Sequence, residues 1–318
     1  MKYFLGIDAG GSKTEALILD ERGNIVGFGR SGPGNYESVG IEKAKENWLL
    51  AIEQAKSGVE IENFEAACFG LAGADFPEDF EMLGQVVASL GITQNYSVEN
   101  DTAIALKAGN PEFWGVLIVM GAGTNGYGRT RDGRNFRYYG EGYAFGDWGG
   151  GSWVVQEMLH MAFRSYDGRG EKTLLEDEVL SYFQYDNYDE FAKALYYNRI
   201  PRDKIIHMAP LLFELASKGD RVALNIAFRV CDEVVTMARA VIKRLELLDH
   251  EVPVVLAGSL FKGAPWMIEY ISAKLHAYVP KAGVKLLTAK PVVGAALLAW
   301  ESAGRDWKSL WPALERFD

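Results

Sequence analysis

The chain has 318 residues, 48% of them apolar, which is enough for a large core and predicts two domains. Its formal net charge is −10 and its lysines and arginines form no cluster, which argues against nucleic acid as a partner. No apolar run is long enough to cross a membrane, and the first strand begins at the N-terminus without a signal peptide, so we expect a soluble cytoplasmic protein.

The cysteines and histidines show no metal-binding pattern. Cys68 and Cys231 lie in apolar surroundings, as expected for core thiols of a protein from a reduced compartment. The four histidines are scattered, and neither CxxC nor HExxH occurs. We therefore expect no metal bound by cysteine or histidine.

The first part of the chain alternates strands and helices. We predict strands at residues 3–7, 16–19, 24–29, 64–71 and 95–98, and helices at 41–57, 79–90 and 103–108. Turn-forming residues fill the loops 9–14 (AGGSKT) and 31–36 (SGPGNY), and the second loop can place Asn35 in a cleft. Asp101 follows the fifth strand and adjoins a helix start, at the edge where open α/β sheets bind ligands.

The opening pattern recurs after residue 110, which predicts a duplicated domain: residues 1–110 and 111–318. We predict strands at 115–120, 127–131, 135–139, 252–257 and 284–287. Helices are predicted at 152–166, 173–183, 189–195, 202–217, 220–247, 262–279 and 291–303. The helical region 172–248 suggests no chemistry, so we interpret it as a scaffold inserted in or covering the second sheet, and the last helix can pack back on the first domain.

The first glycine turn has the composition of an anion site. Glycines leave backbone N–H groups uncovered, and Ser12, Lys13 and Thr14 add donors for phosphate oxygens. Asp8, at the end of the preceding strand, can hold a hydrated Mg²⁺. A plain hairpin with a glycine turn explains this stretch equally well.

The second glycine turn, residues 121–126 (GAGTNG), matches G-x-G-x-x-G, but a hairpin follows it instead of the helix that a dinucleotide site needs. Residues 6–11 fall short of a Walker A loop, because the lysine comes one position late and a strand follows. We favour two glycine turns that grip a triphosphate from both sides, with a third at Gly258 and Ser259 for the adenosine.

Asp101 is the candidate general base for phosphoryl transfer, since it follows a strand at a ligand-binding edge. Its alternative role is to cap the helix that begins after it, which is the commoner task of an aspartate in such a position. The sequence leaves both roles open.

The order of these segments resembles the sugar kinase, actin and Hsp70 superfamily and, within it, the N-acetylglucosamine kinase group of the BadF/BadG/BcrA/BcrD ATPase family. The similar segments, in chain order, are residues 6–14, 32–35, 71–74, 99–101, 121–125, 142–149 and 255–263. The resemblance implies an α/β fold of two actin-like (ribonuclease H-like) domains with mixed sheets and a helical insertion in the second.

The resemblance also implies roles for single residues. Asp101 would be the catalytic base, and Asp8 would hold Mg²⁺ through water. The ATP-binding residues would be Gly10, Gly11, Ser12, Lys13, Thr14, Gly121, Gly123, Thr124, Gly258 and Ser259. The sugar-binding residues would be Asn35, Thr124, Asn125, Gly142 and Asp147.

The function that the resemblance implies is ATP-dependent phosphorylation of a hexose or amino sugar of the N-acetylglucosamine or glucosamine type, at the 6-hydroxyl. ATP and Mg²⁺ would be the cofactors, and relatives suggest a homodimer. The alternative is a nucleotide-dependent ATPase switch or a dehydratase activator of the BadF type. The sequence departs from the family pattern at Trp148 and Gly150, which leaves N-acetyl specificity open. Trp148 would either stack on a sugar face or pack under the glycine loop.

Overall fold

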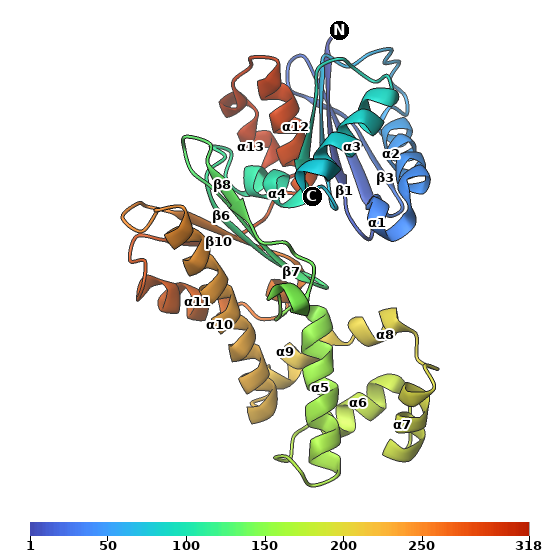
Figure 1. Ribbon diagram of the computed structural model, residues 1–318, viewed down its shortest axis with the longest axis vertical. Coiled ribbons are helices and arrows are strands. Elements are labelled where there is room, and N and C mark those ends of the chain that lie inside the picture. Colours follow the sequence, from blue (N-terminus) through green and yellow to red (C-terminus); the bar gives the residue numbers. More distant parts are fainter. Residues whose placement is uncertain (318) are drawn as a thin grey trace. The chain divides into compact units, whose positions relative to one another are not determined.

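The computed structural model describes residues 1–317, and packing divides them into two compact units (Figure 1). The first unit holds Met1–Leu117, Tyr127–Asn135 and residues 286–317, and the second holds Ile118–Gly126 and Phe136–Lys285. These units are defined by packing and combine separate stretches of the chain, whereas the duplicated domains predicted above are continuous in sequence. The predicted domain boundary near residue 110 therefore stays a prediction. Within residues 1–317, no helix combines the length and the hydropathy needed to span a bilayer.

The first unit is built on a mixed sheet of the order β3-β2-β1-β4-β5. Its strands are β1 Tyr3–Ala9, β2 Thr14–Asp20, β3 Ile25–Ser31, β4 Ala66–Leu71 and β5 Tyr96–Asn100. β1 pairs antiparallel with β2 and parallel with β4, and β4 pairs parallel with β5. The register Ala9–Leu71–Asn100 therefore brings three carboxyl ends to one edge of the sheet.

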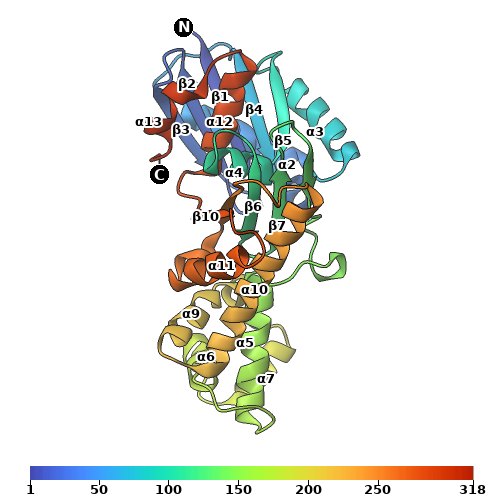
Figure 2. The ribbon, with the colours of Figure 1, turned by 90° about the vertical axis from the view of Figure 1, so that its left-hand side faces the viewer.

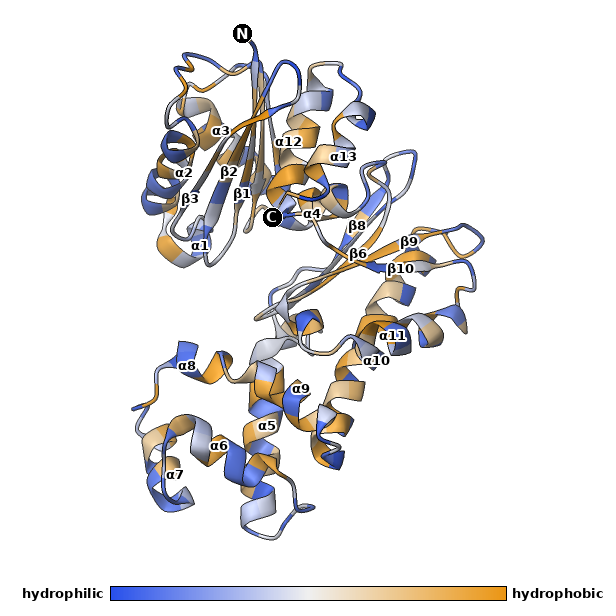
Figure 3. Ribbon diagram, turned by 180° about the vertical axis from the view of Figure 1, so that it is seen from behind, coloured by the Kyte–Doolittle hydropathy of each residue, from blue (hydrophilic) through white to orange (hydrophobic). Residues whose placement is uncertain are grey.

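Helices cover both faces of this sheet (Figure 2). They are α1 Tyr36–Val39, α2 Ile41–Ala55, α3 Pro77–Ser89, α4 Asp101–Gly109, α12 Pro291–Ser302 and α13 Trp311–Leu314, with the 3-10 turn η3 Trp307–Ser309. Side chains alternate along β1: Leu5 and Ile7 enter the core with α2 and α3, whereas Phe4 packs with α4 and α12. The nearly all-apolar α12 appears orange in Figure 3, as expected for a helix enclosed in a core.

Gly6 allows α12 to approach β1 closely, and we predict that Gly6→Ala destabilises the fold by about 2–3 kcal/mol through overpacking. A Cβ at Gly6 would lie 2.4 Å from the backbone N of Ala296 and 2.8 Å from the carbonyl oxygen of Val292. Urea unfolding measures the change. The matched control is Gly84→Ala in α3, where a Cβ meets nothing within 4 Å, so we expect a gain of about 0.5–1 kcal/mol. Equal effects at both sites would contradict the close approach.

The second sheet has the order β10-β9-β6-β7-β8. Its strands are β6 Gly115–Met120, β7 Thr124–Arg129, β8 Asn135–Arg137, β9 Pro253–Ala257 and β10 Gly283–Leu286. The helices of the second unit are α5 Gly151–Tyr166, α6 Leu175–Phe183, α7 Tyr188–Tyr196, α8 Arg202–Ile206, α9 Ala209–Ser217, α10 Arg221–Arg244 and α11 Trp266–His276, with 3-10 turns η1 Tyr143–Phe145 and η2 Ser259–Lys262. The predicted α/β class with two sheets and a helical insertion is confirmed.

Several predicted boundaries are wrong, and prolines explain two of them. The helix predicted at 202–217 is two helices, because Pro210 in the first turn of α9 has no N–H to donate and its ring would clash with the carbonyl of Ile206. The helix predicted at 262–279 begins only at Trp266, after Pro265. The strand predicted at 127–131 begins earlier, at Thr124, so the glycine turn before it contains only residues 121–123.

Candidate functional site

The first glycine turn joins β1 to β2 and is held by hydrogen bonds within the turn and to the loop after β3. The N–H of Gly10 donates to the carbonyl of Lys13 (2.9 Å), and the carbonyl of Gly10 accepts from the N–H groups of Gly34 (2.9 Å) and Asn35 (3.2 Å). Gly11 and Ser12 are exposed, and a Cβ at Gly11 would meet nothing within 4 Å. The backbone at the tip of the turn is therefore open to a ligand, as an anion site requires.

Thr14 has a different environment from the rest of the turn. Its side chain is buried, and its hydroxyl donates to the carbonyl of Gly32 at 3.0 Å. Gly34 is required beside it, because a Cβ there would lie 2.4 Å from the Thr14 hydroxyl oxygen. In this structure Thr14 ties the turn to the loop that follows β3.

Asp8 and Asp101 lie close together at the carboxyl edge of the first sheet. Asp8 is the penultimate residue of β1, and Asp101 is the first residue of α4, directly after β5. The pKa of Asp8 is raised to about 7, first by burial and then by the negative charges of Asp101 and Glu15, with Lys13 acting in the opposite direction. The geometry thus brings together the predicted base and the predicted metal-side carboxylate.

The N-cap of α4 is Asn100 and not Asp101. The side-chain oxygen of Asn100 accepts the N–H of Thr102 at 3.0 Å, and its amide nitrogen donates to the carbonyl of Ala74 and to Asp75, both at 3.2 Å. Asn100 therefore satisfies the helix start and holds the loop after β4. The capping alternative for Asp101 is therefore wrong.

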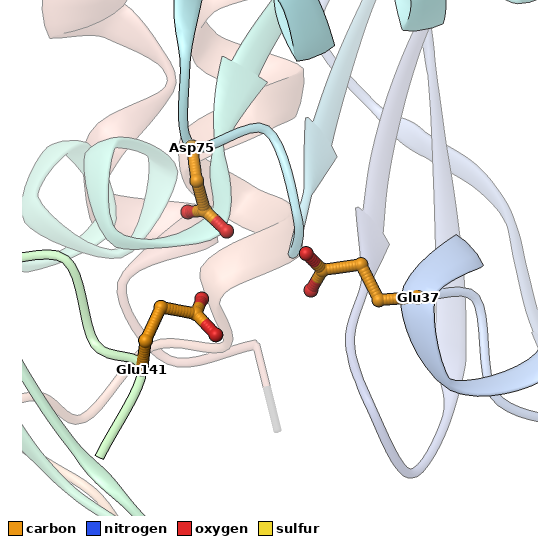
Figure 4. Close-up of side chains that lie close together, drawn as sticks. All are labelled: Glu37, Asp75 and Glu141. Atoms are coloured by element: carbon orange, nitrogen blue, oxygen red, sulfur yellow. The ribbon is translucent and has the colours of Figure 1, made fainter. Parts of the chain in front are cut away.

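Asn35 caps α1 and lies against the loop after β4. Its side-chain oxygen accepts the N–H of Glu37 at 2.9 Å, and a Cβ at Gly73 would lie 2.8 Å from the same oxygen. Figure 4 shows Glu37 and Asp75 with carboxylates turned toward each other, and oxygens of the two lie within 4.8 Å. Sequence reasoning missed this acidic pair because its members are far apart in the chain, one in α1 and the other in the loop after β4.

In the second unit, three glycine segments meet around the end of β6. The N–H of Gly121 donates to the carbonyl of Gly123 at 2.9 Å, and the carbonyl of Gly121 accepts the N–H of Gly151 at 2.8 Å. Gly258 has φ of +110°, and a Cβ there would lie 2.1 Å from the carbonyl oxygen of Met120, so only glycine fits. The predicted phosphate turn and the predicted adenosine turn are therefore neighbours.

The side chains of Thr124 and Asn125 face the loop that contains Asp147. The hydroxyl of Thr124 donates to the carbonyl of Trp148 at 3.2 Å, and a Cβ at Gly140 would lie 2.4 Å from the amide nitrogen of Asn125. These positions come from two segments of the chain, residues 124–125 and 140–148. Their proximity within one unit agrees with a shared ligand-binding role.

Asp147 is 8% exposed, and its side chain holds the backbone of the glycine-rich loop, residues 140–151. Its carboxylate accepts the N–H of Gly142 at 3.2 Å. Burial raises the pKa of Asp147, while backbone N–H groups of residues 140–142 act in the opposite direction. The neighbouring Glu233, which the sequence did not single out, has a pKa raised to about 7 by burial and then by Asp147. Its position inside α10 gave no signal of this proximity.

Trp148 packs edge-on against Trp153, with ring centroids 4.7 Å apart, and the Arg229 guanidinium lies 5.9 Å from its centroid. Trp148 is partly exposed beside the loop.

Cys68 and Cys231 are both buried free thiols whose pKa is raised to about 12 by burial. Neither thiol has the environment of a metal ligand or a reactive cysteine.

The carboxylates around Asp8 fit a divalent cation. Asp8, Asp101 and Glu15 interact closely enough to raise the pKa of Asp8, and a bound cation would relieve this repulsion. Oxygen donors of this kind suit Mg²⁺, which usually keeps several of its waters. The residues present therefore agree with a hydrated Mg²⁺ near Asp8.

Comparison with known proteins gives the family. Residues 5–299 match the model of the BadF/BadG/BcrA/BcrD ATPase family. An N-acetylmuramic acid/N-acetylglucosamine kinase from Clostridium acetobutylicum is 30% identical over 303 residues, which cover 94% of this chain and 98% of that protein. The N-acetyl-D-glucosamine kinase of Dictyostelium discoideum is 30% identical over 314 residues, covering 95% and 98% of the two chains.

A solved structure from Chromobacterium violaceum, described as a candidate N-acetylglucosamine kinase, shares the fold. Its TM-score is 0.74 at 22% identity, and the match covers 94% of this chain and 99% of that one. The predicted actin-like fold is confirmed by this likeness. With the family match over almost the whole sequence, the conclusion is direct: this chain belongs to the BadF/BadG/BcrA/BcrD ATPase family.

Proposed function

We propose that this protein transfers the γ-phosphoryl group of ATP to the 6-hydroxyl of an amino sugar, N-acetylglucosamine or glucosamine. Sugar kinase activity and the use of ATP follow from the family and from relatives of known activity at 30% identity over most of the chain. The names of these relatives support an amino sugar as the acceptor. The 6-hydroxyl, the magnesium ion, the cytoplasmic location and the homodimer remain our predictions.

The observation that carries the proposal is the pairing of Asp8 with Asp101 at one sheet edge, with Asn100 taking over the helix cap. A carboxylate at this edge, in a family of ATPases, can accept a proton from an attacking hydroxyl. We assign this role to Asp101. Asp8 would hold hydrated Mg²⁺, which neutralises charge on the β- and γ-phosphates when bound.

The remaining roles follow from the two glycine turns. The backbone N–H groups of the exposed residues Gly11 and Ser12 would bind phosphate oxygens. Those of residues 122–124 would do the same, whereas the N–H of Gly121 already donates to the carbonyl of Gly123. Gly258 with Ser259 would contact the adenosine. Asn35, Asn125 and Asp147 would orient sugar hydroxyls, with Asp147 also holding the backbone of Gly142 in place. Exclusion of water during the reaction would prevent hydrolysis of ATP as a competing process.

We predict that ADP release rises at least roughly tenfold when an amino sugar is added, since the sugar hydroxyl is the intended nucleophile. A coupled assay with N-acetylglucosamine, glucosamine and glucose measures this. The 6-deoxy analogue of the preferred sugar should inhibit competitively and support no turnover, because it binds but lacks the acceptor oxygen. Turnover of the 6-deoxy sugar would contradict transfer to the 6-hydroxyl.

The second candidate is a nucleotide-dependent switch, because actin-like folds serve both uses. ATP turnover that does not respond to any sugar would favour it. The polar residues Asn35, Asn125 and Asp147 favour the kinase, since a switch has no need of a set of groups suited to a polyol. The buried thiols of Cys68 and Cys231 weigh against an activator that binds a metal cluster.

A further inference from the structure

Glu15 is a charged residue in the core of the first unit. It is the second residue of β2, directly after the first glycine turn, and its side chain is 0% exposed. Neither of its carboxylate oxygens accepts a hydrogen bond of good geometry from residues 1–317. Its main compensation is an ion contact with Lys13, whose Nζ lies 2.6 Å from Oε1, and Arg30 Nε is more distant at 3.9 Å.

The buried carboxylate of Glu15 lowers the stability of the folded state. A carboxylate removed from water loses its hydration, and one ion contact does not satisfy two oxygens. Glu15 also lies opposite Asp8 in the strand register and contributes to the raised pKa of Asp8. An apolar side chain at this position would avoid both effects, so the stability of the fold does not explain the glutamate.

The partner of Glu15 belongs to the glycine turn. Lys13 closes that turn through its carbonyl, which accepts the N–H of Gly10, and its side chain is 36% exposed. A lysine side chain on an exposed turn samples many rotamers, so an unanchored ammonium would be a poorly placed phosphate ligand. The contact with the rigid, buried Glu15 restricts those rotamers.

We propose that Glu15 is a positioning residue that holds the Lys13 ammonium at the first glycine turn, where it meets the phosphates of a bound nucleotide. The inference rests on the proposed function, in which this turn binds ATP. Glu15 acts only through Lys13 and does not touch the nucleotide. The buried charge thus improves nucleotide binding at the expense of stability.

The test measures binding of the non-hydrolysable analogue AMPPNP with Mg²⁺ by calorimetry, without sugar. We expect Glu15→Gln and Lys13→Met each to raise Kd by roughly 5–10-fold, the effect of losing one placed charge-assisted contact. The double variant should bind no more weakly than Lys13→Met alone, because Glu15 has nothing left to position. Glu15→Gln should keep or raise the Tm, which a merely structural role would lower.

The matched control is Glu65→Gln, which removes the 2.7 Å ion contact between Lys2 and Glu65 at the opposite end of β1. It should leave the Kd unchanged. Unchanged or tighter binding by Glu15→Gln, or additive effects in the double variant, would overturn the inference. If AMPPNP binds as expected but no sugar stimulates ADP release, the kinase proposal fails while the role of Glu15 stands.

Discussion

Asp101→Asn is expected to lower kcat by roughly 10²–10⁴-fold and to leave sugar binding within about threefold of the wild type, the pattern of a lost general base. Asparagine keeps the size and polarity of the side chain but cannot accept the hydroxyl proton. Steady-state kinetics give kcat, and calorimetry with the sugar gives its Kd. The predicted fall in turnover corresponds to about 3–5 kcal/mol of transition-state stabilisation.

The structure makes this variant informative because the cap of α4 does not depend on Asp101. Asn100 accepts the N–H of Thr102, so Asp101→Asn leaves that hydrogen bond in place. The matched control is Asp79→Asn in α3, whose carboxylate accepts the N–H of Phe76 and the hydroxyl of Tyr36, both at 2.8 Å. That change should lower stability by about 1 kcal/mol and leave kcat nearly unchanged. Normal turnover by Asp101→Asn would remove Asp101 from the chemistry.

Much of the framework was predictable because local patterns and tertiary packing agree. The apolar runs before both glycine turns became β1 and β6, and the strand before residues 99–101 became β5. Because β1, β4 and β5 run parallel, Asp8 and Asp101 lie at one edge of the sheet, and their electrostatic interaction agrees with this placement. Long segments with one clear periodicity were the easiest to assign.

The missed features depend on contacts between distant segments. Thr14 looked like a phosphate donor, yet its hydroxyl is engaged by Gly32 in a loop that the turn composition could not place. The sequence analysis did not single out Glu15, and only its complete burial marks it as unusual. Glu233 lies on one face of a long helix, and nothing in its neighbours along the chain predicts Asp147 beside it.

Asp8→Asn is the second large effect, and it should act on stability and activity in opposite directions. We expect the variant to lose nearly all Mg²⁺-dependent turnover. In metal-free buffer at pH 8, its free energy of unfolding should exceed that of the wild type by about 2 kcal/mol. This figure is smaller than the pKa shift alone would give, because Asp8 is partly accessible to solvent.

The sign follows from proton binding. The carboxyl of Asp8 has an ordinary pKa of 3.8 and a pKa of about 7 in the folded chain, raised first by burial. Between about pH 4 and pH 7, the folded state therefore holds a proton that the unfolded state releases, so its stability falls as the pH rises. The fall ends about one pH unit above the folded pKa, where both states hold the ionised carboxylate. The advantage of Asp8→Asn should thus grow from pH 4 to pH 7 and then level off.

Asp20→Asn is the matched control for this pH series. Burial tends to raise the pKa of Asp20, but hydrogen bonds from Asn24 and Arg22 outweigh it and lower the pKa overall. The ionised carboxylate is therefore stabilising, and its replacement should reduce stability at neutral pH. Urea unfolding at pH 5, 7 and 8, with EDTA or with Mg²⁺, separates the effects of Asp8→Asn and Asp20→Asn.

Mg²⁺ should stabilise the wild type and not Asp8→Asn, because only the wild type keeps the carboxylate that the cation neutralises. An Asp8→Asn variant less stable than the wild type at pH 8 without metal would show that Asp8 supports the fold, and would leave no reason to assign it to the metal.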